Sequence, residues 1–207
     1  MSLELMDTDC RISAGRNVNT PFRLQVRKPD RGMAEIEFVR VLRLLPTKRI
    51  VALARDEGQP ILVKTFLGRH ATRNAKREIQ GIGHIVDANV RTPRLMWEGS
   101  LRGGGRLLAF EFLPDAVSLF EQLERCESER FEVLSGVMEI MAKLHDHGVV
   151  QKDIHLANFL LSDGQDPDQA FVLDHIAKPL IKNKEIDDWS MGILEIGSFK
   201  NVYCKLS

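Results

Sequence analysis

The sequence predicts an α+β fold with two lobes, the first rich in β-strands with one helix and the second short and mostly helical. Short apolar runs separated by turn residues fill most of residues 36–113, with a single helical pattern among them. After Pro114 the apolar residues recur at steps of three and four. A chain of 207 residues with 43% hydrophobic content can form two small lobes, which we place at residues 36–113 and 114–207.

The first 35 residues are polar and carry two turn signals, at 19–21 and 29–32. We expect them to form an extension outside the core. The acidic N-terminus does not fit a secretory signal, and no apolar run reaches the roughly 18–20 residues of a membrane span. The three cysteines are far apart and fit no zinc spacing, so reduced thiols in the cytoplasm are the simplest interpretation.

The first lobe begins with a strand-like run at 36–42. Two further apolar runs, 49–54 and 61–66, flank the sequence Asp-Glu-Gly at 56–58. A short Asp- and Gly-containing turn between apolar runs is typical of a β-hairpin. We therefore expect these two runs to pair as antiparallel strands.

A basic helix is expected over residues 70–85, with Ile79 and Ile82 on one face. A second hairpin is expected from the runs at 92–98 and 106–113, which bracket a triplet of glycines. The triplet lacks the strand-to-helix context of a phosphate-binding loop. We interpret it as a flexible hairpin tip.

The second lobe is expected to begin with a short helix near residues 120–123. A long amphipathic helix follows and ends at Gly148, because glycine favours the left-handed conformation that terminates helices. Its apolar positions, which we assign to the core, repeat at three- and four-residue steps: Leu134, Val137, Met138, Met141 and Leu144.

The segment 151–161, Gln-Lys-Asp-Ile-His-Leu-Ala-Asn-Phe-Leu-Leu, carries the strongest chemical signal. It places Asp153 and Asn158 on a loop that we expect between short strands at 149–150 and 159–161, and Asp174 follows another apolar run. Phosphoryl transfer needs a carboxylate that orients the attacking hydroxyl, together with an amide and a second carboxylate that hold Mg²⁺. The alternative is that Asp153 and Asn158 only satisfy turn backbone.

Lys64 lies among apolar residues near the end of an expected strand, and Glu78 lies on the helix that follows. A phosphotransferase of this type needs a strand lysine on the nucleotide phosphates, held by a helix glutamate. We therefore expect Lys64 and Glu78 to pair. The alternative is that Glu78 pairs within its own helix with Arg73 or Lys76.

The net charge is zero, but residues 1–100 hold 18 of the 29 basic and 11 of the 29 acidic side chains. A solvated surface is one interpretation of this basic half. The other is an anionic partner, either nucleotide phosphates or a phosphorylated substrate at a membrane. Aromatic residues are few and are not interleaved with the basic ones, so nucleic acid is not an expected partner.

These motifs resemble the protein-kinase-like superfamily, and more closely the bacterial lipopolysaccharide core kinases of the Kdo/heptose kinase group. The resemblance covers residues 36–175, and its most specific part is Lys-Asp-x-His-x-x-Asn-Phe at 152–159. Its other elements are Arg-Leu-Leu-Pro (43–46), Val-Lys (63–64), Arg-Glu-Ile-Gln-Gly (77–81), Arg-Thr-Pro (91–93), Glu-Phe-Leu-Pro (111–114), Leu-His (144–145) and Leu-Asp (173–174).

The resemblance implies transfer of the γ-phosphate of ATP to a sugar hydroxyl of a lipid-linked saccharide. Asp153 would be the catalytic residue, and Asn158 and Asp174 would hold Mg²⁺. The adenine would lie in a cleft between the lobes near Glu111 and Leu113. The enzyme would act in a Gram-negative bacterium, in the cytoplasm and in peripheral contact with the inner membrane.

The sequence departs from protein kinases at several positions. No Gly-x-Gly-x-x-Gly loop is present, and Pro-Thr-Lys-Arg occupies the corresponding turn at 46–49. Gln151 and Lys152 replace His-Arg before the catalytic Asp, which does not fit control by a phosphorylated activation segment. We assign His155 to holding the loop, with contact to substrate as the alternative. Only 33 residues follow Asp174, so the second lobe is either minimal or truncated.

Two other functional hypotheses remain open. One is a protein Ser/Thr kinase or a small-molecule phosphotransferase, because these enzymes share the Asp-x₄-Asn spacing. The other is a catalytically inactive nucleotide-binding scaffold. The missing glycine loop favours it, and the presence of all five expected polar residues opposes it: Lys64, Glu78, Asp153, Asn158 and Asp174.

Overall fold

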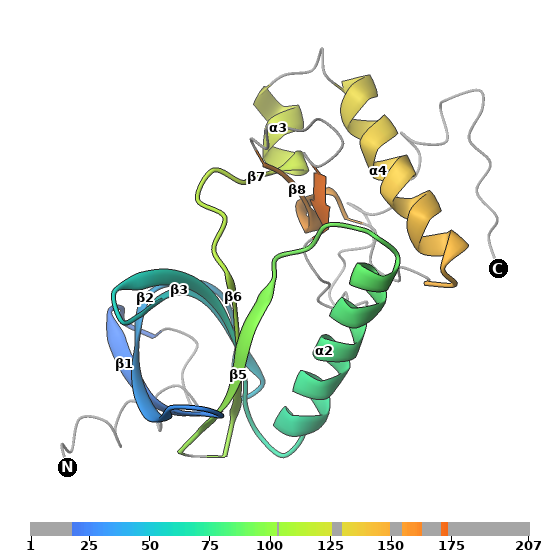
Figure 1. Ribbon diagram of the computed structural model, residues 1–207. Coiled ribbons are helices and arrows are strands. Elements are labelled where there is room, and N and C mark those ends of the chain that lie inside the picture. The colour runs from blue at the N-terminus through green and yellow to red at the C-terminus, as the bar shows by residue number, and fades with distance from the viewer. Residues whose placement is uncertain (1–17, 103, 126–129, 150–154, 163–170, 174–207) are drawn as a thin grey trace. The chain divides into compact units, whose positions relative to one another are not determined.

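The computed structural model describes most of the chain up to Val149 and two short segments after it (Figure 1). The described residues are 18–102, 104–125, 130–149, 155–162 and 171–173. They form two compact units. The first comprises the described residues up to Asp87 together with those of Thr92–Asp115, and the second comprises Ala88–Arg91 and the described residues from Ala116 onward.

Six antiparallel strands of the first unit close into a barrel, in the order β1-β2-β3-β4-β6-β5. The ring closes where Val26 and Arg27 of the first strand pair with Leu101 and Ser100. The six strands are β1 (Phe22–Lys28), β2 (Gly32–Leu45), β3 (Arg49–Asp56), β4 (Gln59–Phe66), β5 (Leu95–Leu101) and β6 (Arg106–Glu111).

Alternate side chains fill the barrel, because successive residues of a strand point to opposite faces. In β3, Ile50, Ala52 and Ala54 are fully buried, whereas Val51 and Leu53 between them stay partly exposed. β2 is long and has two register shifts against β3. Such irregularities bend a strand, which helps one strand to pair along a closed ring.

β1 corrects the expectation that residues 1–35 lie outside the core. Phe22, Leu24 and Val26 are buried in the barrel, and the rings of Phe22 and Phe38 stack with centroids 4.6 Å apart. The two turn signals near residues 21 and 29 mark the ends of this strand and not an irregular segment.

The β3–β4 hairpin is confirmed, and a two-residue turn connects its strands. Glu57 and Gly58 both have positive φ, 51° and 84°, which is the conformation of a type I′ turn. The second expected hairpin is confirmed as β5 and β6. Of the glycine triplet at its tip, Gly104 and Gly105 are described, and residue 103 lies outside the described residues.

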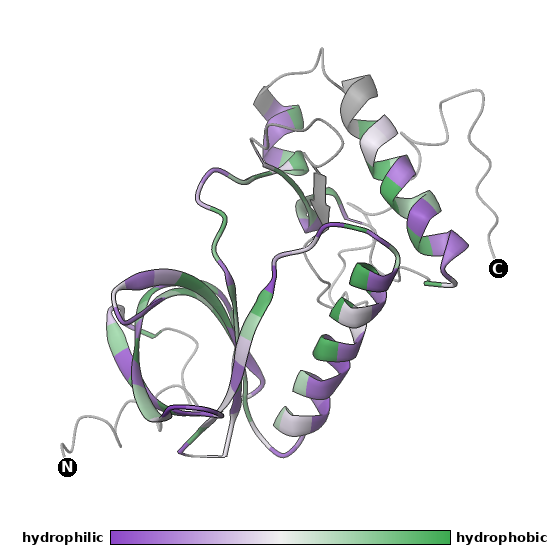
Figure 2. Ribbon diagram, in the orientation of Figure 1, coloured by the Kyte–Doolittle hydropathy of each residue, from purple (hydrophilic) through white to green (hydrophobic). Residues whose placement is uncertain are grey.

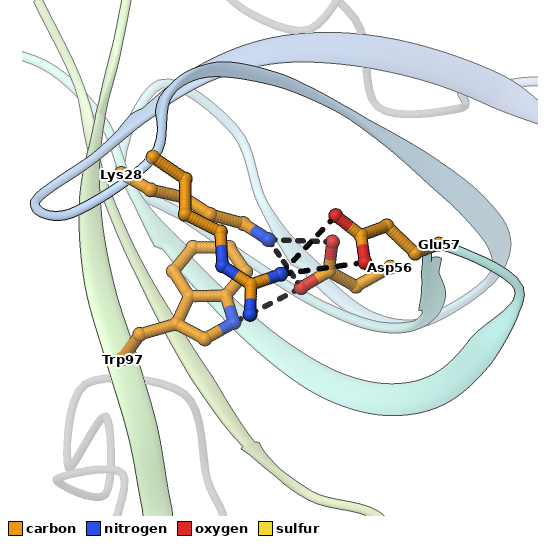
Figure 3. Close-up of polar contacts among 5 residues, drawn as sticks. Lys28, Asp56, Glu57 and Trp97 are labelled. Carbon is orange, nitrogen blue, oxygen red and sulfur yellow. Dashed lines mark hydrogen bonds and ion pairs between the residues drawn. The ribbon is translucent and has the colours of Figure 1, made fainter.

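A charged cluster lies where β1 and β3 end (Figure 3). Lys28 Nζ donates to both carboxylate oxygens of Asp56, at 2.7 and 2.6 Å, and Trp97 Nε1 donates to Asp56 Oδ2 at 3.1 Å. The ammonium also lies 4.8 Å from the centroid of the Trp97 ring. The buried lysine is therefore neutralised by a carboxylate and contacts an aromatic face. Arg31 and Glu57 form a neighbouring but exposed ion pair.

The expected basic helix is confirmed as α2 (Ala71–Asp87). Ala71, Ala75 and Ile82 pack against the outer face of the barrel, where they meet Phe66 and Phe110. The opposite side of the helix is polar, and Figure 2 shows this division along its length. α2 therefore covers the outer surface of β4 and β6.

The second unit contains a three-stranded sheet in the order β7-β8-β9 and several helical segments. Its elements are β7 (Val117–Ser118), α3 (Leu119–Arg125), α4 (Arg130–Asp146), η2 (Leu156–Asn158), β8 (Phe159–Leu161) and β9 (Phe171–Leu173). Ser118 and Glu121 form a reciprocal cap at the start of α3: Ser118 Oγ accepts from the Glu121 N–H at 3.2 Å, and Glu121 Oε2 accepts from the Ser118 N–H at 3.3 Å.

α4 ends as expected at Gly148, which has a φ of 70°. The Gly148 N–H donates to the His145 carbonyl and the Val149 N–H donates to the Leu144 carbonyl, both at 2.9 Å, which is a Schellman motif. Val149 is therefore part of a helix cap and not of a strand, and β8 pairs with β7 and β9 instead. Met141 is buried as expected, but Met138 is 49% exposed and does not belong to the core.

Among the described helices, none combines the length and apolar character needed to cross a membrane.

Candidate active site

Lys64 lies on the outer face of the barrel, where apolar side chains surround it. Val63 and Thr65, its neighbours in β4, are fully buried, with Val63 in the barrel core. Lys64 itself points to the opposite face because strand side chains alternate. Its cross-strand partners are Val51 and Leu108. β4 therefore presents one cation within an otherwise apolar surface.

The expected pair between Lys64 and Glu78 is confirmed. Lys64 Nζ lies 2.9 Å from Glu78 Oε1, and the two side chains are only 5% and 11% exposed. The Lys64 ammonium also lies 5.8 Å from the centroid of the Phe110 ring. The carboxylate comes from α2 and the ring from β6, so three elements fix the position of one ammonium group.

Glu111 ends β6, and Leu113 follows two residues later. The Glu111 side chain is exposed, and its backbone N–H donates to the Arg94 carbonyl at 2.9 Å. Leu113 is half-buried. This geometry leaves the Glu111 carboxylate in solvent, so a role of this segment in binding a ligand would use its backbone or the apolar surface of Leu113.

The turn at 46–49 is short and tightly held. The Lys48 N–H donates to the Leu45 carbonyl at 3.1 Å, and the Lys48 carbonyl accepts from the Leu67 N–H at 2.8 Å. Thr47 has a φ of 60° without being glycine. Both ends of the turn are therefore bonded to other backbone, and the turn connects β2 and β3 directly.

In the second unit, Asn158 ends the short helix η2, and His155 precedes that helix. His155 Nδ1 accepts a hydrogen bond from the Ala157 N–H at 3.1 Å, and the Asn158 N–H donates to the His155 carbonyl at 2.8 Å. These contacts fit the role of holding the loop that we expected for His155. Phe159, the next residue, is fully buried and anchors the segment.

Asp153 and Asp174 lie outside the described residues, so their assigned roles stay predictions from the sequence. Among the described residues, no group of three His, Cys, Asp or Glu side chains could hold a metal ion. Asn158 offers an amide oxygen, which is a suitable ligand for Mg²⁺ when carboxylates complete the set.

Solved structures of protein kinases are similar to this chain. Vaccinia related kinase 3 aligns with a TM-score of 0.51 and 14% sequence identity over 83% of this chain and 59% of that chain. The fold is protein-kinase-like. At 14% identity the likeness shows the fold alone, so the nucleotide-binding roles of Lys64 and Glu78 stay predictions from the sequence.

Other similarities are weaker. Two mutant forms of the PknI kinase domain of Mycobacterium tuberculosis align with TM-scores of 0.43 and 0.45 and identities of 16% and 19%; they cover 67% and 70% of this chain and 57% and 62% of theirs. The probable LRR receptor-like serine/threonine-protein kinase IRK of Arabidopsis thaliana is 25% identical over 123 residues, which is 54% of this chain and 12% of that protein. This chain therefore spans a small part of that relative. No protein-family model matches the sequence.

Two contributors to the candidate site were not predicted from the sequence. Phe110 lies beside Lys64 because β4 and β6 are neighbours, and this pairing is not visible in the local sequence. Leu62 packs against the α2 cluster on the same face of β4 as Lys64. The two-residue spacing of Leu62 and Lys64 is a signal that could have placed them together.

Proposed function

We propose that this protein is an ATP-dependent phosphotransferase that uses an alcohol group as acceptor. The observation that carries the proposal is the buried ion pair between Lys64 and Glu78. A lysine that is held by a carboxylate within an apolar surface has a fixed position, which suits a group that must meet the phosphates of a nucleotide.

The nucleotide would bind on the outer face of β3 and β4. Val51, Leu53 and Leu62 lie on the same face as Lys64 and are partly exposed, so they offer an apolar surface to the adenine ring. The ammonium of Lys64 would neutralise phosphate charge beyond that surface. The segment from Glu111 to Leu113 follows β6, the neighbour of β4, and its backbone would contact the edge of the base.

The catalytic step would use residues of the second unit. Asp153 would orient the acceptor hydroxyl and take its proton while the acceptor oxygen bonds to the γ-phosphorus and ADP leaves. Asn158 and Asp174 would hold Mg²⁺, which neutralises phosphate charge when it is bound. His155 keeps the backbone before Asn158 in place through its bond to Ala157.

For the acceptor, we propose a sugar hydroxyl of the lipopolysaccharide inner core, either Kdo or heptose. The support is the motif at 152–159, in which Gln-Lys replaces His-Arg and a histidine lies inside the loop. A lipid-linked saccharide would bring the enzyme to the cytoplasmic face of the inner membrane. The exposed basic residues of α2, such as Arg73, Lys76 and Arg77, suit an anionic surface of this kind.

A protein Ser/Thr kinase is the second candidate, and the similarity to a plant receptor-like serine/threonine kinase favours it. The two candidates use the same nucleotide site and differ only in the acceptor. The acceptor must therefore be tested directly.

The test is incubation of the protein with γ-labelled ATP, Mg²⁺ and either deacylated core glycolipid or a generic protein substrate. We expect label in the glycolipid. Label in protein alone would replace the sugar acceptor with a protein acceptor, and tight ATP binding without transfer to either substrate would indicate an inactive scaffold.

A further inference from the structure

A pocket of about 210 Å³ lies on the barrel where β1 and β5 separate. The ladder between these strands consists of Val26 with Leu101 and Arg27 with Ser100, and the pocket opens where that ladder stops. Its lining includes Arg27, Pro29, Glu98, Gly99, Ser100 and Arg106.

Three polar side chains of the pocket lie in one row across three strands. Ser100 of β5 pairs with Arg27 of β1 on one side and with Arg106 of β6 on the other. Directly paired residues of antiparallel strands share a face, and neighbouring strands are about 4.8 Å apart. The two arginine backbones are therefore roughly 10 Å apart with a hydroxyl between them, and their long side chains can converge on one ligand.

The guanidinium groups of Arg27 and Arg106 have no acidic partner in the described part of the chain. Arg27 is exposed and Arg106 half-buried, and neither has an ion-pair or side-chain hydrogen-bond partner among the described residues. Lys28, which also borders the pocket, differs because Asp56 neutralises it. Glu98 is the acidic residue of the lining, so the lining carries two guanidinium groups and one carboxylate beside the neutralised Lys28.

Gly99, which lines this pocket, lets β1 and β5 approach each other closely. A Cβ atom at position 99 would lie 2.6 Å from Val26 Cγ1 and 3.0 Å from the Arg27 carbonyl oxygen. A larger residue would push β1 away from β5. The row of Arg27, Ser100 and Arg106 therefore depends on glycine at this position.

We propose that this pocket binds a small phosphate monoester that carries hydroxyl groups, the chemistry of a sugar phosphate. Guanidinium groups match phosphate oxygens with paired N–H donors, and the Ser100 hydroxyl adds a third donor. The Glu98 carboxylate accepts hydrogen bonds from hydroxyl groups and repels a second anionic group. The volume lies below the roughly 300–1,000 Å³ of pockets for drug-sized ligands, which favours a ligand of about monosaccharide size.

The inference does not depend on the proposed kinase activity, and calorimetric titration of the full chain tests it. The probes are glucose 6-phosphate, glucose and inorganic phosphate at low ionic strength. We expect glucose 6-phosphate to bind most tightly. Arg27→Gln and Arg106→Gln should each weaken it about tenfold, because each removes one charged hydrogen-bond donor group. Arg40→Gln removes an exposed arginine of β2 and should leave affinity unchanged.

Glu98→Gln separates recognition of the hydroxyl groups from recognition of the phosphate. It should tighten inorganic phosphate, because it removes a repulsive charge, and should tighten glucose 6-phosphate less or not at all, because the neutral amide oxygen is a weaker acceptor for hydroxyl groups than the carboxylate. Amide NMR shifts should change at Ser100 in wild type and equally in Lys64→Met, which separates this pocket from the nucleotide site. Thermal melts verify that each variant is folded, and Arg106→Lys provides a second variant with an intermediate loss.

Three results would overturn the proposal. The first is no binding of glucose 6-phosphate, and the second is glucose or inorganic phosphate binding as tightly as glucose 6-phosphate. The third is that Arg27→Gln and Arg106→Gln both bind glucose 6-phosphate with the wild-type affinity.

Discussion

Lys64 of β4 and Glu78 of α2 form a nearly buried ion pair, with 2.9 Å between Nζ and Oε1. Two charges removed from water attract each other strongly, but only while both are present. The pair therefore fixes the ammonium group against the ring of Phe110, and it links the barrel to the helix that covers it.

Glu78→Ala should lower kcat/KM for ATP by about tenfold or more, because Lys64 would lose the carboxylate that positions it. It should also lower the free energy of unfolding, since truncating one partner of a buried pair typically costs about 3–5 kcal/mol. Steady-state kinetics and urea denaturation measure both effects. Glu139→Ala is the matched control, because Glu139 is 65% exposed and its ion pair within the described residues is with Lys143 of its own helix. An unchanged kcat/KM in folded Glu78→Ala would remove this pair from the site.

The cluster in Figure 3 offers a comparison of adjacent acidic residues. Asp56→Ala should reduce the free energy of unfolding by about 3–5 kcal/mol, because Lys28 would stay buried without its carboxylate and Trp97 would lose an acceptor. Glu57→Ala should cost at most about 1 kcal/mol, because its ion pair with Arg31 is exposed to solvent on both sides. Chemical denaturation measures the free energy of unfolding of both variants. A loss in Asp56→Ala no larger than that in Glu57→Ala would show that the buried contacts of Asp56 do not stabilise the barrel.

Much of the first unit could be predicted from local patterns. The β3–β4 hairpin follows from two apolar runs around a short turn, and α2 from its apolar spacing. Lys64 and Glu78 could be paired because the motif places one on a strand and the other on the helix that follows. Asn158 could be placed directly before a strand because the apolar run at 159–161 follows it in the sequence.

β1 was missed although its signal is present. Phe22, Leu24 and Val26 alternate with polar residues, which is the pattern of a half-buried strand. The barrel closure itself could not be predicted, because β1 and β5 pair across most of the first unit and no local feature specifies that contact. The strand expected at 149–150 was wrong for Val149, because the glycine cap of α4 extends through it.

Thr65→Val should stabilise the protein by about 1–2 kcal/mol. The Thr65 hydroxyl is fully buried, and it is one of the side-chain atoms with no hydrogen-bond partner in the described part of the chain. Valine has nearly the same shape and removes the cost of burying that hydroxyl. Thermal unfolding of the variant measures the gain, and a lower midpoint would mean that the hydroxyl has a partner in solution.

Gly99→Ala should destabilise the barrel by about 1–3 kcal/mol, because the added methyl group would overlap Val26 and approach the backbone of Arg27. Gly81→Ala in α2 is the contrasting substitution. Nothing lies within 4 Å of a Cβ atom there, so it should stabilise the helix by about 1 kcal/mol. Urea denaturation should therefore give effects of opposite sign, and two effects of the same sign would contradict the close approach of β1 and β5.

The most direct test of the proposed phosphotransferase is the transfer rate of Asp153→Ala, with ATP affinity measured on the same preparation. We expect kcat to fall at least about 100-fold, because the group that orients the acceptor hydroxyl and takes its proton is removed. ATP affinity should change by less than about twofold, because Asp153 is not assigned to the nucleotide. Transfer by Asp153→Ala at the wild-type rate, or no transfer by folded, ATP-bound wild type to either glycolipid or protein, would contradict it.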